Sequence, residues 1–340
     1  MKNEKIIKVA QIGAGSFGIK RAESVQQCTS AELVAVADTD MKTATEAAKN
    51  LGIKALTTEE VLKNSEIDLV TIATPNLHHV KLTCEALFAG KHVLCEKPVA
   101  RNADEAFEIL KVSKETGNKV KVGSNHRYFS SVLKAREIVD SGCIGKVVSF
   151  NGRIGHNGER IKGSWFWDKQ LSGGGAILDN GCHLLDIARW FMGDFVRGSG
   201  LTSNAYWKNA SVEDTATGVF ATEDGRVATI NASWRILSGY FHFELNGEKG
   251  YVTVDGRFDT HGGDRVFVRN LEDGGEIQSF DYGHVRPQSY KLELEDFFAS
   301  IRNGSDPNPS AEDGFKIMKM VEAIYSTKSI DIPSHVDLSV

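Results

Sequence analysis

The sequence predicts an α/β protein in which a doubly wound parallel sheet comes first and an α+β region with an open, mostly antiparallel sheet follows. Two patterns predict this order. Residues 5–123 alternate short apolar segments with amphipathic ones, as strands and helices alternate in a parallel sheet covered on both faces. From residue 146 onward apolar and polar residues alternate with period two, which is typical of strands with one buried face.

The first part contains five apolar segments expected as strands and five amphipathic segments expected as helices. The strands are expected at Ile6–Ile12, Glu32–Ala37, Leu69–Ala73, His92–Cys95 and Lys119–Gly123. The helices are expected at Phe17–Gln27, Lys42–Leu51, Glu59–Asn64, His79–Ala89 and Ala103–Glu115, and a further helix at Ser131–Asp140 leads out of this part. Glycines follow several of these segments, where such elements should end.

The second part contains six segments expected as strands and three expected as helices. The strands are Lys146–Ile154, Thr215–Thr222, Arg226–Trp234, Tyr240–Asn246, Tyr251–Asp255 and Arg265–Asn270, several of them joined by glycine-containing turns. The helices are Ile177–Phe191, Gln288–Arg302 and Ala311–Tyr325. Because no flexible linker separates the two parts, we expect domains at residues 1–124 and 125–340, with the chemistry in a cleft between them.

Composition excludes several classes of protein. The 340 residues carry 40 basic and 45 acidic side chains, so no basic field drives binding to nucleic acid. The longest apolar stretch near the start is interrupted by Lys8 and Gln11 and fits neither a signal peptide nor a membrane span. Five cysteines without CxxC spacing indicate free thiols in a reducing compartment, so we expect a cytoplasmic protein without membrane or nucleic-acid partners.

A glycine-rich turn follows the first expected strand. The residues Gly13-Ala14-Gly15-Ser16-Phe17-Gly18 form GxGxxG at the start of a helix. Gly13 suits a tight turn, Gly15 lets the backbone touch a pyrophosphate, and Gly18 lets the helix pack closely on the strand. The helix N-terminus then offers N–H donors to phosphates. The alternative is a turn that binds nothing, but the strand-to-helix context favours a dinucleotide.

Asp38 ends the next strand, 20 residues after Gly18, where an acid takes the adenosine ribose hydroxyls. Its carboxylate would repel a 2′-phosphate, and the neighbouring Thr39 and Asp40 supply no arginine to accept one. The sequence therefore favours NAD over NADP.

Polar residues follow two further strands of the expected parallel sheet. Thr74-Pro75-Asn76 comes after one, and Glu96-Lys97-Pro98 comes after the other. Open α/β sheets bind ligands at these carboxyl ends. The Lys97 ammonium is suited to stabilising a developing alkoxide, or to acting as a base if burial and nearby cations lower its pKa. A surface lysine at a strand end is the alternative.

Asp179 and His183 follow a run of three glycines, Gly173 to Gly175, at the start of an expected helix. Their i, i+4 spacing places them on one helical face, so we expect a hydrogen bond that raises the proton affinity of the imidazole. Such a pair is suited to general-base catalysis. Alternatively, Asp179 caps the helix and His183 is a satisfied core histidine.

These motifs together resemble the glucose-fructose oxidoreductase, inositol dehydrogenase and rhizopine-catabolism (Gfo/Idh/MocA) family. The resemblance runs through nearly the whole chain, and the order of Glu96-Lys97-Pro98 and the Asp179…His183 pair is specific to it. It implies an N-terminal Rossmann domain, a C-terminal α/β domain, and a homo-oligomer, a dimer or tetramer, that commonly forms through the open sheet. In some members the peptide bond that corresponds to Lys97–Pro98 is cis.

The resemblance also implies roles for individual residues. Lys97, Asp179 and His183 are the expected catalytic residues, with His183 the general base, Lys97 polarising the substrate oxygen and Asp179 orienting the pair. Thr74, Pro75, Asn76, His79 and Glu96 are expected along the pyrophosphate and nicotinamide ribose, and Arg127 near the nicotinamide or the substrate. The other expected cofactor contacts are Gly13, Gly15, Ser16, Phe17, Gly18, Asp38, Thr39 and Lys97.

The family's substrates are mostly sugars and cyclitols, so a ring secondary alcohol is the expected target. Residues 153–171 are rich in aromatic and hydrogen-bonding side chains, which suit a sugar ring and its hydroxyls. The expected substrate contacts are His156, Trp165 and Asn180, with Lys97, Arg127, Asp179 and His183; a second candidate segment is 282–286. Trp165 and Trp167 are equally consistent with core or interface positions. A zinc site at His156, Cys182 and His183 is disfavoured, because adjacent helical residues diverge by about 100°.

The preferred function is therefore an NAD-dependent dehydrogenase of a sugar, cyclitol or sugar derivative. A retained-NAD epimerase or lyase that works through a keto intermediate would use the same residues. A non-catalytic NAD-binding sensor is the third hypothesis, and the intact Lys97, Asp179 and His183 count against it.

Overall fold

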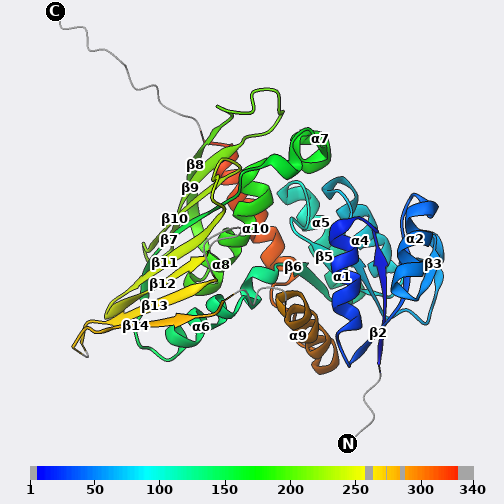
Figure 1. Cartoon of the computed structure of the whole chain (residues 1–340), viewed down its shortest axis with the longest axis horizontal. Coiled ribbons are helices and arrows are strands. Elements are labelled where there is room, and N and C mark those ends of the chain that lie inside the picture. Colours follow the sequence, from blue (N-terminus) through cyan, green and yellow to red (C-terminus); the bar gives the residue numbers. More distant parts are fainter. Residues whose placement is uncertain (1–5, 257–262, 273, 284–287, 328–340) are drawn as a thin grey trace, which may run out of the picture.

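The computed structural model describes residues 6–256, 263–272, 274–283 and 288–327. Two sheets stand side by side with helices between them (Figure 1). The first half contains β1 (Ile7–Ile12), α1 (Ser16–Gln26), β2 (Ala31–Ala37), α2 (Met41–Leu51), β3 (Lys54–Leu56), α3 (Thr58–Lys63), β4 (Leu69–Ile72), η1 (Asn76–His78), α4 (His79–Phe88), β5 (His92–Glu96), α5 (Ala103–Thr116) and β6 (Val120–Gly123).

The remaining elements begin with a short crossover helix. They are η2 (Asn125–Tyr128), α6 (Ser130–Asp140), β7 (Val147–Gly155), η3 (Glu159–Ile161), η4 (Trp165–Trp167), α7 (Lys169–Ser172), η5 (Ile177–Gly181), α8 (Cys182–Met192), β8 (Phe195–Ser203), β9 (Thr215–Thr222), β10 (Val227–Ser233), β11 (Tyr240–Gly247), β12 (Gly250–Gly256), β13 (Arg265–Asn270), β14 (Ile277–Asp281), α9 (Ser289–Asn303) and α10 (Ala311–Tyr325).

The first sheet confirms the doubly wound prediction. Its six strands are parallel and lie in the order β3-β2-β1-β4-β5-β6. The order reverses between β1 and β4, so the carboxyl ends of these strands flank the point where such sheets bind ligands. The three-residue strand β3 was not expected, because it is too short to show a period of two.

The second sheet has eight strands in the order β14-β13-β12-β11-β7-β10-β9-β8. Every neighbouring pair is antiparallel except β7 with β10, which confirms a mostly antiparallel sheet. Helices α6, α8 and α10 lie on the face turned toward the first sheet (Figure 1). Strands β9 to β12 alternate buried with more exposed residues, which leaves the opposite face open.

Helix α9 comes late in the chain but packs against the first sheet, beside α1 (Figure 1). Its Leu294, Phe297 and Phe298 are fully buried in one apolar cluster with Ile7 and Val9 of β1. Burying such large side chains contributes roughly 1.5–3 kcal/mol each. Residues from the far end of the sequence therefore complete the core around the nucleotide-type sheet.

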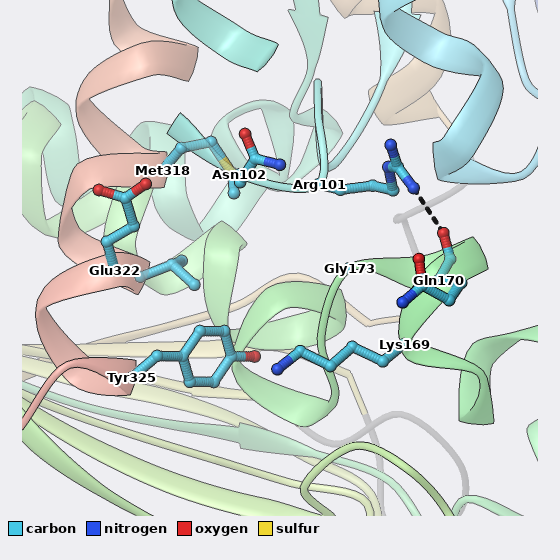
Figure 2. A pocket seen from close by; sticks show the side chains of 9 residues that line it. Arg101, Asn102, Lys169, Gln170, Gly173, Met318, Glu322 and Tyr325 are labelled. Carbon is cyan, nitrogen blue, oxygen red and sulfur yellow. Dashed lines mark hydrogen bonds between the residues drawn. The ribbon is translucent and has the colours of Figure 1, made fainter. Parts of the chain in front are cut away.

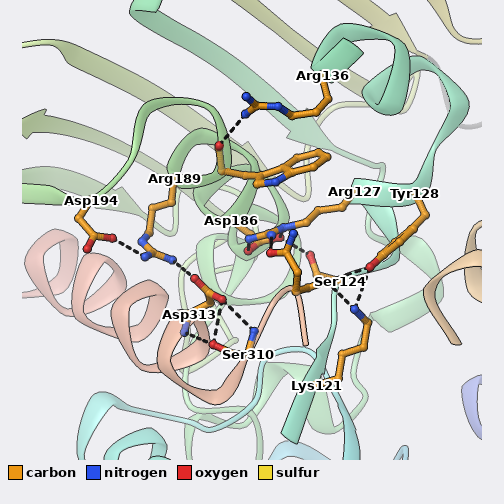
Figure 3. A network of polar contacts seen from close by, with 12 residues as sticks. Lys121, Ser124, Arg127, Tyr128, Arg136, Asp186, Arg189, Asp194, Ser310 and Asp313 are labelled. Atoms are coloured by element: carbon orange, nitrogen blue, oxygen red, sulfur yellow. Dashed lines mark hydrogen bonds and ion pairs between the residues drawn. The ribbon is translucent and has the colours of Figure 1, made fainter. Parts of the chain in front are cut away.

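Buried ion pairs join the two halves of the structure. Arg127 of η2 forms a two-pronged bond to Asp186 of α8, and Ser124 donates to the same carboxylate at 2.7 Å (Figure 3). Lys121 of β6 donates to Tyr128 and to Asp296 of α9, both at 2.8 Å. Arg127, Asp186 and Lys121 are buried, whereas Asp296 is exposed. Loss of the partner of a buried charge leaves that charge uncompensated, so these pairs fix the position of the crossover.

All five cysteines are free thiols, as expected, and four of them are buried. Within the described residues, no helix combines the length and apolarity needed to cross a bilayer.

Candidate active site

The turn between β1 and α1 has the geometry that its glycines predict. Gly13 has φ +93°, and a Cβ there would lie 2.4 Å from the Ala73 carbonyl oxygen. A Cβ on Gly18 would lie 1.9 Å from the Gly13 carbonyl oxygen, so helix and turn touch at this position. Gly15 differs, because its Cβ would meet nothing within 4 Å. Open space in front of a helix start without a capping side chain suits a pyrophosphate.

Asp38 sits beside this turn, at the end of β2. One carboxylate oxygen accepts the Ala14 N–H at 2.8 Å, and the other accepts the Asp40 N–H at 3.0 Å. The carboxylate is thus fixed by backbone donors while Asp38 remains partly exposed. Ser16, Phe17 and Thr39 are exposed around it. The residues present fit the adenosine end of an NAD molecule.

The side chains after β4 hold neighbouring loops together. The Asn76 amide donates to the Ser172 carbonyl at 2.7 Å, and the His79 ring contacts the Pro98 and Thr74 carbonyls at 2.8 and 2.9 Å. Both side chains are buried. His79 therefore connects the Thr74-Pro75 turn to the segment after Lys97, and Asn76 connects η1 to the end of α7.

Lys97 joins the two halves at the carboxyl end of β5. Its ammonium donates to the Asp179 carboxylate and to the Asp179 backbone carbonyl, each at 2.9 Å. Burial is the largest single influence and lowers the pKa of Lys97, but Asp179, Cys182 and Glu96 together raise the pKa above its ordinary value. Lys97 is therefore a cation, and of its two expected roles the structure favours polarisation over proton abstraction. The Lys97–Pro98 peptide bond is cis.

The expected hydrogen bond between Asp179 and His183 is absent from the contacts of these two described residues, so that prediction is wrong. Residues 177–181 form a π-helix, η5, so the regular α-helical spacing does not hold there. The Asp179 carboxylate binds Lys97 through one oxygen and accepts the Trp234 indole N–H at 3.0 Å through the other. Burial is the largest single influence and raises its pKa, but Lys97 and His156 together lower the pKa below its ordinary value.

The predicted increase in the proton affinity of His183 is also wrong. Burial lowers the pKa of His183 well below its ordinary value, and His126, Lys97 and Arg21 lower it further. The imidazole stacks on the His126 ring, with 3.6 Å between centroids and 13° between planes. Its Nδ1 is buried without a partner among the described residues. His183 is thus neutral at pH 7 and able to accept a proton.

Glu213 holds the start of the segment that carries Asp179 and His183. Its buried carboxylate accepts the Gly175 and Ile177 N–H groups at 3.0 and 3.1 Å, and the Tyr325 hydroxyl at 3.1 Å. A Cβ on Gly175 would lie 1.9 Å from the Glu213 carbonyl oxygen. Glycine at position 175 therefore allows this segment to pack closely against residue 213. The Glu213 side chain fixes the backbone before Asp179, and no sequence motif indicated this role.

Two of the expected ligand contacts, Glu96 and Arg127, take part in buried ion pairs. Arg21 of α1 donates to Glu96 and also to Glu293 of α9, and it is 1% exposed. Glu96 therefore links the nucleotide helix to the strand that precedes Lys97. The Arg127 guanidinium donates to both oxygens of the Asp186 carboxylate and lies over the Trp190 ring, 5.2 Å from its centroid. These contacts favour a positioning role for both residues.

The expected substrate residues lie in different surroundings. The His156 Nε2 atom lies 3.8 Å from the Asp179 carboxylate, and the Asn180 amide nitrogen is buried without a partner among the described residues. His156 therefore borders the Lys97–Asp179 pair, and Asn180 directly follows Asp179 in the chain. Trp165 is half-buried and stacks on Phe166, with centroids 3.9 Å apart. In the second candidate segment Tyr282 donates its N–H to Asp264, and residues 284–286 lie outside the described residues.

Two hollows of about 360 and 370 Å³ lie beside this site rather than at it. Both are lined by Lys169, Gly173 and Tyr325, and the first also by Arg101, whose guanidinium donates to the Gln170 carbonyl (Figure 2). Lys97, Asp179 and His183 line neither hollow. The described residues contain no group of three side chains arranged to hold a metal ion.

Comparison with known proteins gives consistent matches along the chain. Residues 7–124 match the family model "Oxidoreductase family, NAD-binding Rossmann fold", and residues 132–253 match the "GFO/IDH/MocA C-terminal domain". Levoglucosan dehydrogenase of Pseudarthrobacter phenanthrenivorans is 25% identical, with 88% of this chain and 89% of that protein covered. Inositol 2-dehydrogenase of Rubrobacter xylanophilus is 28% identical, with 97% and 93% covered. The structure of a levoglucosan dehydrogenase in complex with NADH and levoglucosan superposes with a TM-score of 0.86 at 23% identity, covering 94% of this chain and 96% of that one, which shows the shared fold.

Proposed function

This chain belongs to the GFO/IDH/MocA family of NAD-binding oxidoreductases, and from that premise we propose that it oxidises a ring secondary hydroxyl of a sugar, cyclitol or sugar derivative. The observation that carries the proposal is the contact between Lys97 and Asp179. It places a cation from the first sheet against an acid from the second part of the chain, beside a neutral His183. Residues 1–124 hold the nucleotide in this proposal, and residues 125–340 hold the substrate.

The nucleotide site is formed by the turn after β1 and by Asp38. The N–H groups at Gly15, Ser16 and Phe17 face the pyrophosphate, and the Asp38 carboxylate takes the ribose hydroxyls. NAD bound there supplies the hydride acceptor. Because the Asp38 carboxylate repels a 2′-phosphate, NADP is the poorer cofactor.

His183 and Lys97 act on the substrate hydroxyl. The neutral His183 imidazole takes the hydroxyl proton, which requires a pKa low enough to keep the ring unprotonated beforehand. The Lys97 ammonium stabilises the negative charge that develops on the same oxygen. Asp179 keeps Lys97 charged and fixes its direction. In reverse, the protonated His183 returns its proton to the oxygen of a ketone.

The proposed substrate class is based on the side chains next to Asp179. His156 and Asn180 offer hydrogen-bonding atoms to neighbouring hydroxyls, and the Asn180 amide nitrogen has no protein partner in the described structure. Relatives act on inositol and levoglucosan, which are ring polyols, and this supports an uncharged ring polyol here.

The test is the absorbance at 340 nm of purified protein with NAD or NADP and a panel of inositols, anhydrosugars, glycosides, free sugars, amino sugars and nucleotide sugars. We expect NADH to form with one group of ring polyols. No NADH with any of them, while NAD is recovered from the denatured protein, would refute a releasing dehydrogenase and favour the retained-NAD epimerase or lyase.

We further propose a cytoplasmic homotetramer that assembles through the open face of the second sheet. That face alternates polar with apolar side chains, among them Val219 and Val227, which are 43% and 40% exposed. Its edge strand β8 is exposed along most of its length, with Leu201 at 63%. Size-exclusion chromatography with light scattering is expected to give about four times 37.2 kDa, and a 37 kDa species would refute the assembly.

A further inference from the structure

We propose that Trp234 is a positioning residue for the reaction, because its indole N–H anchors the carboxylate that holds Lys97 in place. The inference rests on the proposed function and extends it to a residue that no sequence motif singles out. Trp234 follows β10 directly and is fully buried, and its indole nitrogen lies 3.0 Å from one oxygen of Asp179.

The anchor matters because the other oxygen of Asp179 binds the Lys97 ammonium at 2.9 Å. A carboxylate with one partner on each oxygen cannot rotate without breaking one of the two contacts. His156 lies 3.8 Å from the oxygen that Trp234 occupies, so a competing partner is close. Without the indole N–H, we expect the carboxylate to turn toward His156, and Lys97 loses its fixed direction.

Trp234 is held at its ring and at its backbone. Its ring lies 5.9 Å from the Trp207 ring, and its backbone N–H donates to the Asp214 carbonyl at 2.8 Å. A side chain fixed in this way has few rotamers open to it, so it imposes a direction on Asp179 instead of following it. Such rigid support is what catalytic groups need for orientation.

The neighbouring Trp207 supplies a matched control. It is also buried, at 5% exposed, but its indole nitrogen has no hydrogen-bond partner among the described residues. Trp234→Phe and Trp207→Phe therefore make the same chemical change in adjacent rings, and only the first removes a bond to Asp179.

The first measurement is steady-state kinetics of the purified full chain with the best substrate of the panel. Loss of one hydrogen bond to a charged group corresponds to a fall in kcat of about tenfold for Trp234→Phe, with KM for NAD unchanged. Trp207→Phe keeps an aromatic ring beside Trp234 and removes no bond to Asp179, so its kcat is expected to fall far less than that of Trp234→Phe. Equal kcat values in the two variants would overturn the proposal.

The second measurement needs no substrate, so it separates this inference from the proposed function. The chain has five tryptophans, and the indole N–H signals of Trp234 and Trp207 are assigned by their loss in the two Phe variants in ¹⁵N-labelled protein. In Asp179→Asn the Trp234 signal is expected to shift and the Trp207 signal to stay. An Asp179→Asn spectrum in which no indole N–H signal moves would overturn the proposal, and because this outcome needs no assignment it holds even if Trp234→Phe fails to fold. A shifted signal in a protein that oxidises no polyol would support the anchor and refute the proposed reaction.

Discussion

Two single substitutions, Gly15→Ala and Gly18→Ala, are expected to affect different properties, NAD affinity in the first and stability in the second. The two glycines lie only three residues apart, Gly15 directly before α1 and Gly18 in its first turn. A Cβ on Gly18 would lie 1.9 Å from the Gly13 carbonyl oxygen and 2.9 Å from its carbon, against about 3.4 Å for ordinary contact. Helix α1 must therefore move by more than 1 Å. A Cβ on Gly15 meets nothing, and its φ of −69° is one that alanine adopts freely.

These distances set the expected magnitudes. Overpacking of this kind costs about 1–3 kcal/mol, and at roughly 2–4 °C per kcal/mol the Tm of Gly18→Ala falls by about 2–12 °C. Gly15→Ala loses a little stability because alanine is a poorer N-cap than glycine, and gains a little because alanine lowers the conformational entropy of the unfolded chain. The two effects nearly cancel, so the Tm stays within about 2 °C of wild type. The new methyl group enters the space assigned to the pyrophosphate, and we expect the Kd for NAD to rise at least tenfold, about 1.4 kcal/mol.

Two assays on the ligand-free protein test this. Thermal unfolding gives the Tm, and isothermal titration with NAD gives the Kd. The reasoning is refuted if Gly15→Ala binds NAD as tightly as wild type, since the turn would then not contact the nucleotide. It is equally refuted if Gly18→Ala unfolds at the wild-type temperature.

Four further predictions concern catalysis, cofactor choice and stability. Lys97→Ala and His183→Ala are each expected to lower kcat by two or more orders of magnitude with little change in NAD affinity, and full activity in either would remove that residue from the mechanism. Asp38→Ser is expected to lower the ratio of kcat/KM with NAD to kcat/KM with NADP at least tenfold, and an unchanged ratio would contradict the role of its charge. Asp186→Asn leaves Arg127 buried without its carboxylate and is expected to cost about 3–5 kcal/mol in urea unfolding; an effect below about 1 kcal/mol, as for an exposed pair, would contradict this. The folded pKa of His183 lies below the unfolded value of about 6.5, so the stability that the neutral imidazole contributes is present above pH 6.5 and is lost as the pH falls toward the folded pKa. We therefore expect the fall in Tm between pH 7.5 and pH 5 to be smaller in His183→Gln than in wild type. An equal fall in the two proteins would contradict this assignment.

The elements that local patterns specify were predicted well from the sequence. Strand β9 has the expected bounds, Thr215–Thr222, because its buried and exposed residues alternate almost without interruption. Strand β8 was missed, since Gly198 and Gly200 give it little intrinsic preference for a strand. A Cβ on Gly200 would lie 2.4 Å from the Thr217 carbonyl oxygen and 2.8 Å from Ile324, so the packing of β9 and α10 selects glycine there. Both contacts come from residues distant in sequence and leave no local signal.

The candidate site also contains features that local sequence predicts and features that depend on distant residues. The roles of Gly13 and Gly18 were predictable because the strand, the turn and the helix are contiguous in sequence. The partner of Asp179 was predicted wrongly because i, i+4 spacing suggests His183, whereas the true partners Lys97 and Trp234 lie 82 and 55 residues away. No sequence pattern indicates a π-helix at residues 177–181, and without it the local argument assumes a regular helix.

The place of α9 has a consequence for how the protein is made. The apolar cluster that contains Ile7, Val9 and Ala22 is completed by a helix that begins at Ser289. At about 5–20 residues per second, β1 therefore waits roughly 14–56 s after its own synthesis for this helix. Arg21 waits equally long for Glu293, 272 residues further on. We expect a ribosome-stalled chain that ends near residue 280 to be captured by chaperones, and one extended past residue 303 to be released from them.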